Sequence, residues 1–346
     1  MQASRLKQWL GVGTIGLMGA AGCGAGVAGP DGPAAVPARV MNEQLGRGVN
    51  FGNALEAPRE GDWGVTLEAL HFQRAAEAGF ETVRLPVRWS SHTGESSPYV
   101  VEPAFLERVD WAIDQALAND LNVIVNVHHY EEMATNPTAH TARWLAIWRQ
   151  VASRNRDRPQ NVLFELLNEP HGGLTAGLWN GMLRDGIAAI RESNPDRNLV
   201  VGPVQWNSTD ALPQLDLPDD DHLIVTVHFY EPFPFTHQGA SWVDGADAWL
   251  GTEWHGTEEE RAFVTGILER AAEWGRSHGR PIFLGEFGAY SAADMDSRTR
   301  WTAYVAREAE RLGMSWTYWE FMAGFGLYDP ATDGWVQPLR DALLPD

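Results

Sequence analysis

Residues 122–127 read NVIVNV and residues 222–227 read HLIVTV, two short runs that are almost continuously apolar. A strand with one face in water alternates apolar and polar residues, whereas a parallel strand buried on both faces is apolar throughout. These two runs therefore predict buried parallel strands. Parallel strands need long crossover connections, usually helices, so the predicted fold class is α/β.

The same rhythm of apolar run, polar loop and amphipathic helix repeats through residues 41–346. Helical patterns occupy residues 103–120, 141–157 and 257–279, and in the last of these Phe263, Ile267 and Trp274 fall on one face. The predicted strands are Gly48–Asn53, Thr82–Pro86, Asn122–His128, Val162–Asn168, Leu199–Gly202, Leu223–Tyr230, Ile282–Glu286 and Ser315–Glu320.

Eight such units favour a single (β/α)₈ TIM barrel, which typically takes about 250 residues plus loop insertions. A doubly wound open sheet is the alternative. It would be expected to carry G-x-G-x-x-G after its first strand, but the first predicted strand here reads GVNFGN. The catalytic groups of a barrel are expected at the carboxyl ends of its strands.

The first 40 residues are predicted to lie outside the barrel. Residues 1–23 combine a basic start, Arg5 and Lys7, with an uncharged stretch too short to span a bilayer, which is typical of a signal peptide. Cys23 stands where a bacterial lipobox would place its lipidated cysteine, so a cell-surface or periplasmic lipoprotein is expected. Plain secretion and a retained anchor are the alternatives. Residues 24–40 are rich in Gly, Ala and Pro and predict a tether.

The composition excludes several classes of partner. The chain has 46 acidic and 26 basic residues, a formal net charge of −20, and this charge opposes binding to nucleic acid or to anionic polysaccharides. A single cysteine excludes a disulfide framework and a cysteine-based zinc site. Sixteen tryptophans suggest flat apolar ligand faces, such as those of neutral sugars, although most should be core residues.

Polar residues gather at the ends of seven predicted strands, where burial would be costly unless they were paired, because buried groups lose their hydration. We expect these groups to share one site at one end of the barrel. They are Asn53, Glu56, Arg84, His128, His129, Asn168, Glu169, His228, Tyr230, Glu286, Trp319 and Glu320.

Glu169 and Glu286 end the fourth and seventh predicted strands, which lie across a barrel mouth from each other. Two carboxyl groups facing a cavity lined by Trp and His suit glycosidic bond cleavage, in which one protonates the leaving oxygen and the other attacks the anomeric carbon. The alternative is that each glutamate is half of a structural ion pair, for example with Arg84.

Taken together, the motifs GVNFGNALE, VRLPVRW, VNVHHY, ELLNEPHG, VHFYEPF, LGEFGAY and YWEF resemble family 5 of the glycoside hydrolases, and most closely its bacterial endo-β-1,4-glucanases. The resemblance covers residues 41–340. It implies that Glu169 of NEP is the acid/base and that Glu286 of GEFG is the nucleophile of a retaining, endo-acting β-1,4-glucanase.

The same resemblance implies supporting roles for other residues. Arg84 and Tyr230 would hold Glu286, Asn168 would bond the sugar 2-hydroxyl, and Trp319 would stack under the sugar at the cleavage point. His128 and His228 complete the supporting set, and the remaining sugar contacts would come from Asn53, Glu56, His129, His237 and Trp242.

Several alternatives remain at this level. The substrate is expected to be cellulose-type or mixed-linkage β-glucan, with mannan or glucomannan as the alternative. A catalytically inactive sugar-binding barrel and a metallohydrolase using His128, His129 and His228 are rival classes, although no H-E-x-x-H motif occurs. We expect no cofactor, no metal and a monomer.

Overall fold

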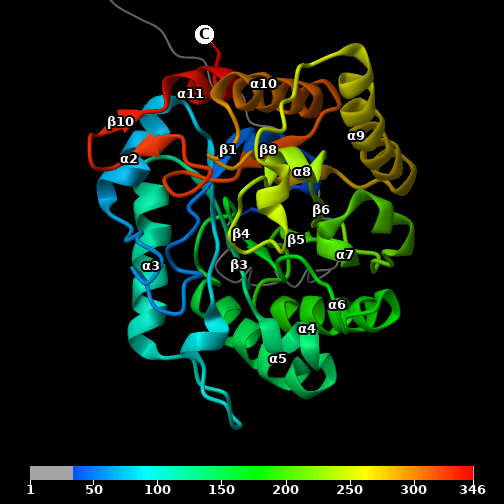
Figure 1. Ribbon diagram of the computed structural model, residues 1–346. Coiled ribbons are helices and arrows are strands. Elements are labelled where there is room, and N and C mark those ends of the chain that lie inside the picture. The colour runs from blue at the N-terminus through cyan, green and yellow to red at the C-terminus, as the bar shows by residue number, and fades with distance from the viewer. Residues whose placement is uncertain (1–33, 346) are drawn as a thin grey trace, which may run out of the picture. The chain divides into compact units, whose positions relative to one another are not determined.

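The computed structural model describes residues 34–345, and its core is a closed barrel of eight parallel strands (Figure 1). Neighbouring strands pair in chain order, and β8 pairs with β1. The predicted (β/α)₈ architecture is confirmed. The strands are β1 (Arg47–Asn50), β2 (Thr82–Leu85), β3 (Asn122–Asn126), β4 (Val162–Glu165), β5 (Leu199–Val201), β6 (Leu223–His228), β7 (Ile282–Glu286) and β8 (Ser315–Tyr318).

Long helices surround the barrel, because their apolar faces cover the outer faces of the strands (Figure 1). The helices are α1 (Ala38–Leu45), α2 (Ala69–Ala78), α3 (Pro103–Ala118), α4 (Glu131–Thr135), α5 (Pro137–Arg154), α6 (Ala176–Arg191), α7 (Val204–Asn207), α8 (Phe233–Thr236), α9 (Glu258–His278), α10 (Met295–Arg311) and α11 (Gln337–Leu343). A two-stranded hairpin of β9 (Tyr328–Asp329) and β10 (Gly334–Trp335) precedes α11.

The face of α9 that packs differs from the one suggested by the sequence. Phe263 is 52% exposed, whereas the neighbouring Val264 and Leu268 are fully buried and Trp274 is largely buried. The prediction that Phe263 belongs to the packed face is therefore wrong by one position, since a shift of one residue rotates a side chain by about 100° around a helix.

The expected tether ends earlier than residue 40. Helix α1 begins at Ala38, and its Ala38, Met41 and Leu45 side chains are buried against the apolar interior of the barrel. The Asn198 side chain also donates a hydrogen bond to the Val36 carbonyl, 2.7 Å away. Small residues that looked too weakly apolar to become ordered are thus anchored by the barrel interior. Residues 1–23, including Cys23, and the first part of the tether lie outside the described residues.

The interior of the barrel changes character along its axis. The side chains packed against α1 are apolar, namely Ile124, Leu163, Val200, Ile224 and Phe283. At the opposite, carboxyl ends, five strands terminate in a buried polar residue: Asn50, Asn126, Glu165, His228 and Glu286. This concentration of buried polar groups marks the end of the barrel at which chemistry is expected.

All the strands except β7, which ends at Glu286 as predicted, are shorter than predicted at this end. Several residues assigned to strand ends lie in the following loops, because the backbone leaves the extended conformation there: φ is 64° at Asn53, and it is 48° at Glu169, the residue after predicted strand end Asn168. Positive φ is uncommon for residues other than glycine. The loops that follow β1 and β4 therefore begin with unusual turns at predicted site residues.

Candidate active site

The structure brings Glu169 and Glu286 together. Glu286 is the last residue of β7, and Glu169 lies four residues beyond the end of β4. One carboxylate oxygen of each, together with a ring nitrogen of His228, lies in a group whose members are all within 4.8 Å of one another. A pair of carboxyl groups this close leaves no room for a water between nucleophile and sugar, since enzymes that need such a water hold them about 6.5–9.5 Å apart.

Two donors hold the carboxylate of Glu286. The Arg84 Nη1 atom donates to Oε1 at 2.6 Å, and the Tyr230 hydroxyl donates to Oε2 at 2.8 Å. Burial raises the pKa of Glu286 above its usual value, while the charge of Arg84 and the Tyr230 hydrogen bond oppose the rise. With both oxygens occupied by donors, the ionised carboxylate is the form that this geometry satisfies.

Arg84 is fully buried and is the centre of a hydrogen-bond network. Its Nε and Nη2 atoms donate to the two oxygens of Glu165 at 2.6 and 2.7 Å. Besides Glu286, it also donates to the side-chain oxygens of Asn50 and Asn168. Sequence reasoning found Arg84 and Asn168 but missed Glu165 and Asn50. A signal was available for Glu165, because it is a carboxylate within the apolar run VLFELL and such a group needs a buried partner.

Glu169 lies in a different electrostatic environment. The His228 Nδ1 atom lies 2.8 Å from its Oε1 atom, and the backbone carbonyl of Glu169 is bonded by the His171 ring. Burial raises the pKa of Glu169 to about 7, although the charge of Arg84 opposes the rise. A carboxyl group with this pKa can hold a proton at neutral pH and release it during a reaction.

The Trp319 ring forms a flat surface beside His128. Its ring stacks on His128 with centroids 5.7 Å apart and planes 9° apart. The Asn126 amide bonds the His128 ring at 3.1 Å, and Gly52 lies against the indole, where a Cβ would come within 3.1 Å. Trp319 is partly exposed, so it has a supported face and an available face, as sugar stacking requires.

The loop after β6 carries two further predicted binding residues. His237 is buried, stacks on Phe233 with centroids 4.1 Å apart, and lies edge-on to Trp242. Trp242 is 59% exposed and packs against Tyr290. The structure therefore presents Trp242 to solvent at the barrel mouth, with His237 acting as packing beneath it.

The predicted binding role of Glu56 does not match its position. Its side chain is fully buried, and its oxygens accept hydrogen bonds from the backbone N–H groups of Asn53 and Ala54. Glu56 thus holds the loop after β1 in shape, and we correct the expectation that it contacts sugar. Asn53, in the same loop, is partly exposed.

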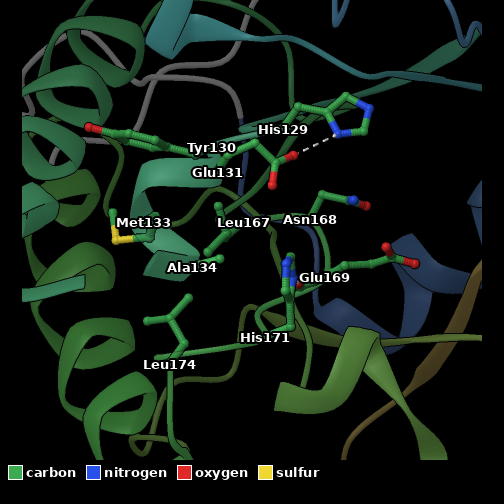
Figure 2. Close-up of a pocket in the computed structure, with 10 residues that line it drawn as sticks. All are labelled: His129, Tyr130, Glu131, Met133, Ala134, Leu167, Asn168, Glu169, His171 and Leu174. Atoms are coloured by element: carbon green, nitrogen blue, oxygen red, sulfur yellow. Dashed lines mark hydrogen bonds and ion pairs between the residues drawn. The ribbon is translucent and has the colours of Figure 1, made fainter. Parts of the chain in front are cut away.

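Figure 2 shows the cavity beside Glu169, between the loops that follow β3 and β4. His129 lines this cavity, and its Nδ1 atom lies 3.7 Å from the Glu131 Oε1 atom. Two exposed tryptophans that sequence reasoning did not single out adjoin residues of this cavity: Trp206 stacks on His171, and Trp63 packs edge-on to His129.

The histidines of the metallohydrolase alternative do not gather as one ligand set. Among residues 34–345, the only cluster that could share an ion consists of His228 and the two glutamates, without His128 or His129. His128 and His129 pack ring against ring, and the nitrogens of His228 bond Glu169 and Asn207. Both ring nitrogens of His228 are thus engaged by hydrogen bonds within the protein, and the three histidines do not form the predicted ligand set.

A closed eight-stranded barrel with paired glutamates at the carboxyl ends of β4 and β7 defines the class of protein as a glycoside hydrolase barrel. Comparison with known families agrees. Residues 46–324 match the model described as cellulase (glycosyl hydrolase family 5), and the chain belongs to this family. The resemblance inferred from the motifs is confirmed.

The relatives are bacterial endoglucanases. The chain is 34% identical over 288 residues to endoglucanase H of Acetivibrio thermocellus, covering 83% of this chain and 31% of that protein. It is 30% identical to the cellulase/esterase CelE of the same organism, covering 82% of this chain and 36% of that protein. The chain thus spans about a third of the length of these two curated relatives.

Among solved structures, endoglucanase Cel5A of Thermotoga maritima is 45% identical, with a TM-score of 0.87 over 89% of this chain and 100% of that one. Structures of the same enzyme have been solved with cellobiose and with mannotriose. The cellulose synthase subunit Z of Clostridioides difficile is 36% identical, with a TM-score of 0.85 over 87% of this chain and 99% of that one.

Proposed function

We propose that this chain is an endo-acting β-1,4-glucanase that retains the anomeric configuration. The observation that carries the proposal is the approach of Glu169 and Glu286 oxygens to within 4.8 Å, which suits direct attack on the sugar and a covalent intermediate. The named relatives, which are endoglucanases, support β-1,4-glucan as the substrate class.

In the first step, ionised Glu286 attacks the anomeric carbon. The bond from that carbon to the glycosidic oxygen breaks, and Glu169 gives its proton to the departing oxygen. In the second step, Glu169 takes a proton from water, which attacks the anomeric carbon and releases Glu286. Glu169 starts protonated, since burial raises its pKa to about 7, and it ends protonated, so the cycle closes.

The supporting residues follow from their contacts. Arg84 and Tyr230 hold Glu286 for attack, because they bond its two oxygens. Asn168 accepts a hydrogen bond from Arg84 through Oδ1, which leaves its amide N–H groups for the sugar 2-hydroxyl. Trp319 supplies the stacking face above His128. Asn53, His129 and Trp242 surround the mouth and contact sugars on either side of the cleavage point.

A panel of polysaccharides tests the substrate. We expect hydrolysis of carboxymethylcellulose and barley β-glucan, with little activity on xylan. Glucomannan is a second candidate substrate, because the similar Cel5A of T. maritima has been solved with mannotriose. The double variant Glu169→Gln/Glu286→Gln is the control for contaminating activity. Binding of cello-oligosaccharides without turnover on any of these polymers would favour an inactive sugar-binding barrel instead.

We further propose that the protein is exported and anchored by a lipid on Cys23, and that it acts as a monomer. The basic, apolar and small-residue pattern of residues 1–23 supports export. In residues 34–345, no helix combines the length and apolar character needed to cross a membrane. Mass spectrometry of the mature amino terminus tests lipidation, since a start beyond Cys23 would contradict it, and light scattering after gel filtration tests the monomer.

A further inference from the structure

Three consecutive residues beneath the active site adopt a left-handed backbone. In α7, φ is 59° at Gln205, 58° at Trp206 and 56° at Asn207, although none of them is glycine. Each such residue costs free energy and persists only when its surroundings impose this conformation. This run places Trp206 beside His171 and buries Asn207 completely.

The buried Asn207 side chain contacts His228. Its Nδ2 atom lies 3.2 Å from the His228 Nε2 atom, and its Oδ1 atom is buried without a hydrogen-bond partner among the described residues. The space for this amide is made by Gly202, since a Cβ at that position would lie 2.2 Å from Oδ1. The contact is thus built by two features of the fold, the left-handed turn and the glycine.

The opposite edge of the His228 ring faces the glutamates. Its Nδ1 atom lies 2.8 Å from Glu169 Oε1 and 3.6 Å from Glu286 Oε2, so it bonds Glu169. A bulge between Val227 and His228 sets the ring opposite Glu286 in the β6–β7 pairing. Burial lowers the pKa of His228 to about 4, so the ring is neutral and carries one proton. The charged or titratable groups around it are Glu169, Glu286, Arg84, Glu165 and His128.

A neutral imidazole donates from one nitrogen and accepts at the other. An amide N–H of Asn207 donating to Nε2 requires that the proton of His228 be on Nδ1, from which it donates to Glu169 Oε1. The acidic proton of Glu169 must then be on Oε2. With the opposite tautomer, Nδ1 would accept, and the acidic proton of Glu169 would be held on Oε1, facing the ring.

We propose that Asn207 is a positioning residue that fixes the tautomer of His228 and thereby keeps the proton of Glu169 on the oxygen that protonates the leaving group. This inference rests on the proposed function for Glu169. It assigns Asn207 no contact with the substrate, because its side chain is buried beneath the histidine.

Two variants test it. Asn207→Asp replaces the donor facing Nε2 by an acceptor of the same shape and tolerates the left-handed backbone. Gly202→Ala displaces the same amide without changing it. Asn155→Asp is the matched control, since Asn155 is a buried asparagine on the barrel exterior whose Oδ1 atom also lacks a partner among the described residues.

The readout compares two substrates. Cleavage of cellotetraose needs an acid for the leaving group, whereas cleavage of 2,4-dinitrophenyl β-cellobioside does not. For Asn207→Asp and Gly202→Ala we expect kcat/KM for cellotetraose to fall about 10- to 100-fold, a part of the effect of general acid catalysis. The value for the dinitrophenyl substrate should change much less, and Asn155→Asp should alter neither. The alkaline limb of the pH–rate profile should move to lower pH in Asn207→Asp. A carboxylate at position 207 favours a charged His228, and a positive charge beside Glu169 lowers the pKa of that carboxyl group.

Nitrogen NMR of histidine-labelled protein reads the tautomer directly and does not depend on activity. The wild-type His228 should carry its proton on Nδ1, and Asn207→Asp should add a proton on Nε2. A wild-type ring protonated at Nε2, or equal losses on the two substrates, would overturn the proposal. If the wild type cleaves neither substrate, the proposed function fails, while the spectrum still decides the tautomer.

Discussion

The guanidinium of Arg84 lies 2.6 Å from Glu286 Oε1, and both side chains are almost completely buried. The same guanidinium binds Glu165 through two parallel hydrogen bonds. A single cation is therefore shared by two carboxylates, and only Glu286 among them reaches the cleft beside Glu169. This arrangement gives the two glutamates of the cleft different environments, one beside a cation and one beside a neutral histidine.

Removal of Glu286 and removal of Glu169 should impair different steps of the reaction. Glu286→Ala lacks the nucleophile, and added azide should restore cleavage of an activated substrate with an α-glycosyl azide as product. Glu169→Ala should lose about 10²–10⁴ in rate on unactivated glucan, the usual size of general acid catalysis. With this variant azide should give the β-product. Proton NMR of the azide adducts checks both, and exchanged product configurations would reverse the assigned roles.

The wild-type enzyme should release product with the β-configuration. Double displacement inverts the anomeric carbon twice, and the approach of Glu169 to Glu286 within 4.8 Å leaves no alternative path for water in the first step. Proton NMR during hydrolysis of cellotetraose follows the first anomer formed, before mutarotation. An initial α-anomer would falsify the retaining mechanism.

The pH dependence of kcat/KM should be bell-shaped. Activity requires protonated Glu169, so the alkaline limb should fall near pH 7, where burial has placed the pKa of this group. It also requires ionised Glu286, whose pKa burial raises above the usual value, so activity should fall again on the acid side. The alkaline limb should be much weaker for a dinitrophenyl cellobioside, whose leaving group needs no acid, than for cellotetraose. Alkaline limbs of equal depth on the two substrates would assign the limb to another group.

Trp319→Ala should remove the stacking face over His128 while leaving the carboxylates in place. We expect turnover on polymer to fall by about two orders of magnitude, or about 3 kcal/mol at 1.36 kcal/mol per tenfold change. Trp111→Ala, which removes a tryptophan of α3 contacted by Arg108 on the barrel exterior, is the control. Near-normal turnover of Trp319→Ala would make Trp319 a packing residue.

Glu165→Gln should destabilise the protein and slow catalysis together. It removes one of the two buried carboxylates that share Arg84. Because Glu286 still compensates the guanidinium charge, the loss of stability should be about 1–3 kcal/mol, the range for hydrogen bonds to a charged group. Arg84 is then free to shift relative to Glu286. Asp110→Asn breaks a partly exposed pair with Arg154 and should cost less than about 1 kcal/mol. Denaturant unfolding and kcat measure the two effects. Equal free energies of unfolding for the two variants would contradict the expected contribution of the buried network to stability.

The sequence by itself determined the order of the eight strands and placed Glu169 and Glu286 at or just beyond strand ends. Local patterns suffice for this, because a buried parallel strand is apolar throughout and a charged residue at its end is conspicuous. The exact ends of the strands were less predictable. Asn53 and Glu169 adopt positive φ, a conformation set by their tertiary surroundings rather than by local preference.

Only the tertiary structure decided which polar groups meet. Arg84 and Glu165 are 81 residues apart in the chain. Asn207 contacts His228 because of a left-handed turn that no local sequence pattern predicts. Glu56 looked like a cleft residue, yet its side chain folds back onto the loop backbone. The physical reason is that a buried polar side chain is positioned by the partner that satisfies it, and barrel closure brings such partners together from distant strands.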